Sequence, residues 1–364
     1  MQDQSRNYGI ELLRIIAMFM IVVLHTLGMG QNGIIERVAP NSLQFHMAWI
    51  LEITCFCAVN IYGLISGYVL CDKPFRLSRL INLWFSIAFY TITINIIANL
   101  GGWRPLNINN LLDSFFPISR QQYWYLSSYC GMLLLTPFLN KALAEVKRNE
   151  VKKILVPGIL IISILPTLFS SDPLSTHVGY STIWLCVMYL VGGWLKKADI
   201  KSRVKSRWLI ASFGIMILTT HLCKITLIYI TKKWFNIDNE CNVLITYISP
   251  SIIISSIALF LLVTKINLSI FQTCIIRHLS PMTLGIYIIH ANPFVWPRFA
   301  QGLADYFVQY SPARFIIAIL AAALVVYLAC SAIEFFRIKL FQLVHVRQFS
   351  EHLERKFSAL INRF

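Results

Sequence analysis

Long apolar segments dominate this chain and restrict it to a membrane fold. A helix needs about 20 mostly apolar residues to cross the hydrocarbon core of a bilayer. Lipid offers the backbone no hydrogen-bond partners, and the apolar segments do not alternate as barrel strands would, so we expect helices. The sequence predicts an all-α polytopic membrane protein with about ten transmembrane helices, at 7–29, 43–70, 80–100, 122–140, 154–170, 178–195, 208–231, 242–263, 280–298 and 313–336.

The composition and charge agree with this class. Of 364 residues, 57% are hydrophobic and 13% are charged, whereas a soluble domain carries about 25% charged residues. The net charge of +16 would suggest nucleic-acid binding in a soluble protein. Here the basic residues lie in short segments between the apolar ones, and no nucleic-acid-binding motif accompanies them. We therefore interpret the charge as a topology signal.

The placement of the basic residues predicts the orientation. If the N-terminus is cytoplasmic, most Lys and Arg fall on the cytoplasmic side, including the clusters within 73–79, 141–153 and 196–207. That bias predicts that both termini are cytoplasmic and that the number of crossings is even.

A second, smaller unit follows the last apolar segment. Apolar residues recur there at helical spacing among charged ones, at Phe349, Leu353, Phe357, Leu360, Ile361 and Phe364. The pattern predicts a basic amphipathic helix on the inner leaflet. We expect a ten-helix transmembrane domain over 1–336 and a cytoplasmic tail over 337–364.

Two ionisable residues in the first apolar segment are the strongest functional candidates, because charge within a membrane is costly. Arg14 and His25 are eleven residues apart, about three helical turns, so they share a face roughly 16 Å apart along the axis. A guanidinium suits phosphate, and an imidazole suits base or nucleophilic catalysis. Acyl-coenzyme A has phosphates and a reactive thioester separated by such a length. The structural alternatives are an Arg14–Glu11 ion pair and a His25 hydrogen bond to another helix.

Four segments in this order resemble the acyltransferase 3 family of bacterial integral-membrane acyltransferases. They are the Arg-x10-His pattern at Arg14 and His25, ISGYVL at 65–70, QYWYLSSYCGMLLLTPFLN at 122–140, and TLGIYIIHANPF at 283–294. Asn60 departs from the pattern, because many members carry Pro there.

The resemblance implies transfer of an acyl group, usually acetyl, from cytoplasmic acyl-CoA to a hydroxyl of a cell-envelope glycan or lipid-linked saccharide. It places the chain in the bacterial inner membrane and makes Arg14 and His25 the essential pair. Direct transfer and an acyl-enzyme intermediate stay open. A transporter or flippase for glycans or small solutes is the alternative, although no inverted repeat is evident.

Further candidates have a functional and a structural interpretation each. Glu52 is expected either to orient the His25 imidazole or to make an unrelated hydrogen bond. Arg76 and Arg79 either bind coenzyme A phosphates or are ordinary cytoplasmic-side residues.

The remaining candidates concern the acceptor and packing. Trp124 and Tyr125 either form a sugar platform or belong to an interfacial aromatic belt. His290 either contributes to the acceptor site or makes a structural contact. Ser66 and Gly67 favour close helix packing. His221 and Lys224, in the seventh apolar segment, favour a structural role or a water-filled cavity. No metal is expected, because the histidines within the spans and the nine cysteines lack ligand spacing.

Overall fold

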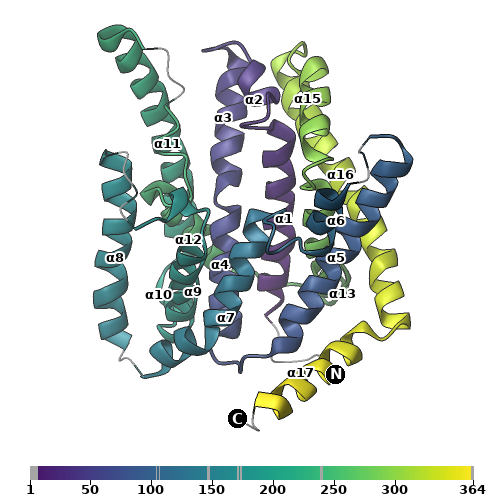
Figure 1. Cartoon of the computed structure of the whole chain (residues 1–364). Helices are drawn as coiled ribbons and strands as arrows, with labels where there is room; N and C mark the ends of the chain where they lie inside the picture. The colour runs from purple at the N-terminus through teal and green to yellow at the C-terminus, as the bar shows by residue number, and fades with distance from the viewer. Residues whose placement is uncertain are drawn as a thin grey trace.

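The computed structural model describes residues 7–361 except 104, 106, 146, 147, 170, 171, 173 and 238–240. Residue 170 of the predicted fifth span and residues 362–364 of the predicted tail lie outside the described residues. Within that part of the chain every regular element is a helix (Figure 1). The elements are α1 (Tyr8–Leu27), α2 (Ile34–Arg37), α3 (Leu43–Phe56), α4 (Ala58–Leu70), α5 (Leu77–Leu100), α6 (Ile108–Phe115), α7 (Trp124–Glu145), α8 (Arg148–Phe169), η1 (His177–Gly179), α9 (Thr182–Lys197), α10 (Ile200–Arg203), α11 (Ser206–Phe235), α12 (Pro250–Thr264), α13 (Ile270–Leu279), η2 (Ser280–Met282), α14 (Thr283–His290), α15 (Trp296–Phe307), α16 (Pro312–Leu343) and α17 (Val346–Ile361).

Helical stretches long and apolar enough to cross a membrane coincide with predicted spans. Among the described residues there are six, Tyr8–Leu27, Leu43–Leu70, Leu77–Leu100, Lys152–Phe169, Ser206–Phe235 and Pro312–Leu343, and α12 is a shorter apolar helix. The chain is an all-α polytopic membrane protein, as the sequence predicts.

The predicted span over 280–298 is not one uninterrupted helix. Helix α14 ends at His290, and α15 begins only at Trp296. Pro293 lies in the break and has no backbone N–H to continue the helix. Asn292 occupies the break instead: its Nδ2 donates to Tyr123 Oη at 3.0 Å, and its Oδ1 accepts from the Phe294 backbone N–H at 3.0 Å. The prediction of a continuous helix there is wrong because these bonds replace the helical ones.

Helices α4 and α9 pack with their backbones in contact. A Cβ added at Gly67 would lie 1.8 Å from the Tyr189 carbonyl oxygen, and one added at Gly192 would lie 2.2 Å from that of Leu64. The interpretation of Gly67 as a close-packing residue is confirmed. Small residues allow this approach in membrane helices, where packing takes the place of the hydrophobic effect.

Helix α17 lies across one end of the bundle, at the same end as the start of α1 (Figure 1). Glu354 Oε1 accepts from the Leu77 backbone N–H at 2.6 Å, which ties α17 to the first turn of α5. Phe349, Phe357 and Leu360 are exposed. Helix α16 continues past residue 336 to Leu343, so the amphipathic helix begins later than the predicted boundary at 337.

Candidate active site

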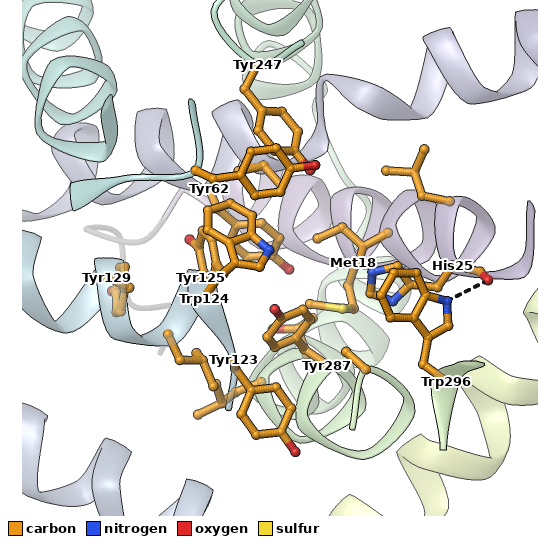
Figure 2. Close-up of a pocket in the computed structure, with 18 of the residues that line it drawn as sticks. Met18, His25, Tyr62, Tyr123, Trp124, Tyr125, Tyr129, Tyr247, Tyr287 and Trp296 are labelled. Atoms are coloured by element: carbon orange, nitrogen blue, oxygen red, sulfur yellow. Dashed lines mark hydrogen bonds between the residues drawn. The ribbon is translucent and has the colours of Figure 1, made fainter. Parts of the chain in front are cut away.

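A central cavity of about 660 Å³ collects several of the side chains that the sequence singles out. Arg14, His25, Glu52, Trp124 and Tyr125 all line it. Aromatic side chains make up much of the remaining wall. Figure 2 shows Tyr62, Tyr123, Tyr129, Tyr247, Tyr287 and Trp296, and Tyr180 lines the cavity as well. Concave, mostly apolar sites with a few convergent polar groups are typical of ligand pockets.

Helix α1 presents Arg14 and His25 to this one cavity, with Met18 on the same wall. The same-face prediction for the pair is therefore confirmed. The Arg14 guanidinium also pairs with Glu11, with 3.1 Å between Nη1 and Oε2. Glu11 in turn accepts a hydrogen bond from Ser280. The ion pair predicted as a structural alternative is thus present, and the Arg14 side chain is still 30% exposed.

Arg14 also borders a second pocket of about 410 Å³. Arg79, Asn82, Ser66 and Tyr129 line this pocket with it. Arg14 and Arg79 therefore face one space, which suits a polyanionic ligand. Arg76 is exposed just before α5 and lines neither pocket.

The His25 imidazole is held mainly by other rings. The Trp296 ring centroid lies 4.3 Å from that of His25, the His290 centroid 4.9 Å, and the Tyr287 centroid 6.4 Å. Trp296 Nε1 also donates to the His25 carbonyl oxygen at 2.9 Å, the bond drawn in Figure 2. His25 Nδ1 is buried and finds no hydrogen-bond partner within the described chain. The neighbouring rings thus fix the position of the imidazole, while its Nδ1 makes no hydrogen bond within the described chain.

His290 stands behind His25 at the helix break. Its Nδ1 lies 2.5 Å from the Ile286 carbonyl oxygen, and its Nε2 has no partner among the described residues. His290 is buried and does not line the cavity itself. It contacts the site only through the ring of His25.

Glu52 does not hydrogen-bond to His25 in the part of the chain that the structure describes. Its side chain is 1% exposed, and Oε2 has no hydrogen-bond partner there. Its electrostatic partner is Lys224 of α11. The structure therefore brings Glu52 to the cavity wall without forming the predicted orienting bond.

Trp124 belongs to an aromatic cluster on the cavity wall. Its ring centroid lies 4.4 Å from that of Tyr180 and 5.8 Å from that of Tyr247, the latter in a stacked arrangement. Tyr125 stacks on Tyr129 at 5.9 Å. Several residues of the cavity wall are not among those predicted from the sequence. Tyr287 lies within the quoted TLGIYIIHANPF segment, whereas Tyr180 and Tyr247 come from connections that carry no motif.

Asn60 has a structural explanation. It is fully buried; its Nδ2 donates to the Tyr247 carbonyl oxygen at 2.8 Å, and its Oδ1 accepts from Trp184 Nε1 at 2.8 Å. Asn60 thus ties α4 to α9 and to the segment that carries Tyr247. A proline could make neither bond.

Comparison with known proteins identifies the class. The model of a family described as an acyltransferase domain matches residues 7–333. The chain belongs to this acyltransferase 3 family. Comparison with the curated proteins and with the solved structures gave no match. Over the described residues, no group of three or more His, Cys, Asp and Glu side chains is arranged to hold a metal ion.

Proposed function

We propose that this protein is a bacterial inner-membrane O-acyltransferase. It transfers an acyl group, acetyl in the first instance, from cytoplasmic acyl-CoA to a hydroxyl of a cell-envelope glycan or lipid-linked saccharide. Both termini are then cytoplasmic. The observation that carries the proposal is that Arg14 and His25, three helical turns apart on α1, line one cavity in a member of an acyltransferase family.

The donor binds with its phosphates at the Arg14 end of the cavity. Arg14 and Arg79 line the adjoining pocket, and two guanidinium groups there match the charge of a nucleotide polyphosphate. The pantetheine arm then runs along the α1 face toward His25.

His25 acts on the acceptor. In direct transfer, its imidazole takes the proton from a sugar hydroxyl as the oxygen attacks the thioester carbonyl carbon. The carbon–sulfur bond breaks, and the leaving thiolate takes that proton from the imidazolium. The products are the sugar ester and free coenzyme A. Trp124 and Tyr125 are assigned to the acceptor side of the cavity, and His290 contributes to the acceptor site through its contact with the His25 ring.

The test is label transfer by the protein in nanodiscs, with radiolabelled acetyl-CoA and host envelope glycan. We expect label in the glycan and equimolar free thiol from the wild type, and neither from His25→Ala. His278→Ala, at an exposed histidine of α13, is the matched control and should resemble the wild type. Acetyl-CoA that neither binds nor reacts would overturn the proposal and favour transport.

A further inference from the structure

A polar pocket of about 390 Å³ lies between α5, α16 and α17, and the transfer step above does not use it. Helix α17 crosses the end of the bundle where α5 begins and α16 ends (Figure 1). Two guanidinium groups, three carboxamides and one hydroxyl line the pocket, and no carboxylate of the described chain does. A wall of N–H donors without an acidic residue suits an anion. These polar side chains belong to Asn82, Ser86, Arg337, Gln342, Arg347 and Gln348.

Hydrogen bonds between the helices hold this pocket in shape. Ser350 Oγ of α17, which is fully buried, donates to Asn82 Oδ1 of α5 at 3.0 Å. Arg337 Nη1 of α16 donates to Ser86 Oγ of α5 at 3.3 Å. Glu354 adds the bond from α17 to the backbone of α5 described above. The walls from α16 and α17 are therefore both tied to α5, and a ligand meets them already in place.

The two arginines differ in what they offer to a ligand. The Arg337 guanidinium pairs with the fully buried Glu334 carboxylate, with 3.0 Å between Nε and Oε2, and Tyr90 Oη also donates to that carboxylate at 2.6 Å. Its charge is thus balanced within the protein. The Arg347 side chain is 79% exposed; its Nε lies 3.0 Å from Glu351 Oε1, and its Nη atoms make no hydrogen bond in the described chain. Because an exposed ion pair is weak, the Arg347 guanidinium can bind a phosphate through its Nη atoms.

This pocket shares two wall residues with the pocket of Arg14 and Arg79. Asn82 and Ser86, one helical turn apart on α5, line both pockets. The two pockets are therefore neighbours along one face of α5. Coenzyme A carries phosphate in two places, as a diphosphate in the arm that leads to the thiol and as a 3′-phosphate on its ribose. Two neighbouring anion sites match this pair of groups.

We propose that the pocket between α5, α16 and α17 binds the 3′-phosphate of the donor. Arg347 contacts the phosphate, and Arg337, fixed by Glu334, is a positioning residue of the wall. This inference rests on the proposed function and extends its donor site beyond the Arg14–Arg79 pocket. Both arginines of the new site follow residue 333, where the match to the family model ends. The other source of a phosphate at this end of the bundle is the headgroup of an anionic phospholipid, and the experiment separates the two sources.

The experiment compares acetyl-CoA with 3′-dephospho-acetyl-CoA by calorimetric titration of the protein in phosphatidylcholine nanodiscs. We expect the wild type to bind acetyl-CoA about tenfold more tightly, since hydrogen bonds between charged groups contribute about that much. Arg347→Gln should lose about tenfold in affinity for acetyl-CoA and stay within about twofold of the wild type for the dephospho donor. Damage to the fold would weaken the binding of both donors alike.

Arg355→Gln is the matched control, because Arg355 is an exposed arginine of the same helix and lines neither pocket. It should bind both donors as the wild type does. The 3′-phosphate site is overturned if the wild type does not distinguish the two donors, or if Arg347→Gln weakens both equally.

The site is also overturned if Arg347→Gln keeps the wild-type preference for acetyl-CoA. In that case, a fall in the phosphatidylglycerol that the variant retains, measured by native mass spectrometry, would assign the pocket to a lipid headgroup. A wild type that binds neither donor would instead overturn the proposed function.

Discussion

Trp296 covers the imidazole of His25, with 4.3 Å between the ring centroids, and its indole N–H bonds to the His25 carbonyl oxygen. Trp296 is the first residue of α15 and follows the non-helical turn after His290. The break in the predicted ninth span therefore returns the chain to His25. A continuous helix would carry this indole elsewhere.

Replacement of Trp296 tests this packing. Trp296→Leu removes both the ring contact and the hydrogen bond, so we expect the kcat for acetyl transfer to fall about tenfold because the imidazole is no longer fixed. Trp296→Phe keeps a ring and should lose less. Steady-state kinetics with saturating acetyl-CoA measures the effect, and Trp234→Leu, at an exposed position of α11, is the control. A normal kcat in Trp296→Leu would show that the indole does not hold the imidazole.

The arginine variants should fall into two classes by their affinity for acetyl-CoA. Arg14→Ala and Arg79→Ala each remove a guanidinium from the shared pocket and should weaken acetyl-CoA binding about tenfold or more. Arg76→Ala should bind normally because Arg76 is exposed and lines neither pocket. Calorimetric titration with acetyl-CoA makes the comparison. Equal losses for Arg76 and Arg79 would contradict the pocket assignment.

Because the backbones of α4 and α9 are in contact, we expect any larger residue at Gly67 to destabilise the protein strongly. Gly67→Ala places a methyl group where the Tyr189 carbonyl lies, so the helices must separate. We expect a loss of about 3 kcal/mol or more in stability and little monodisperse protein after extraction. Gly158→Ala adds the same methyl group to α8, where nothing lies within 4 Å, and should behave normally. Equal yields and equal melting temperatures of the two variants would refute the close contact.

A pH effect on stability is expected at the loop after α4. The Lys196 ammonium, which donates to Asp72 Oδ2 at 2.7 Å, lowers the pKa of the Asp72 carboxyl. A depressed pKa in the folded state adds stability above the ordinary carboxyl value of about 4, and that stability is lost as the pH falls through the folded value. Because both groups are partly exposed, the gain is about 0.5 kcal/mol.

The measurement is the melting temperature of the wild type against Asp72→Asn. The wild type should melt slightly higher at pH 7, and the difference should disappear at acidic pH. A difference that grows on acidification would contradict this sign.

The sequence predicts the fold class and the Arg14–His25 pair well because both depend on local periodicity. Apolar length identifies helices, and the eleven-residue spacing brings the two side chains to one face. The rest depends on tertiary contacts that no local pattern contains. Tyr180 and Tyr247 reach the cavity from the connections between helices. The hydrogen bond from Asn60 to the Tyr247 carbonyl oxygen helps to hold the connection that carries Tyr247. Glu52 lines the same cavity as His25 but does not make the predicted bond to it in the described chain, and it interacts electrostatically with Lys224, which lies far along the chain.

The contacts of Gly67 and Gly192 have a mechanical consequence. Two helices whose backbones are in contact can neither slide nor rotate past each other unless they first separate. Helices α4 and α9 therefore move as one rigid unit. Any change in the shape of the cavity that admits a ligand therefore leaves the α4–α9 pair intact.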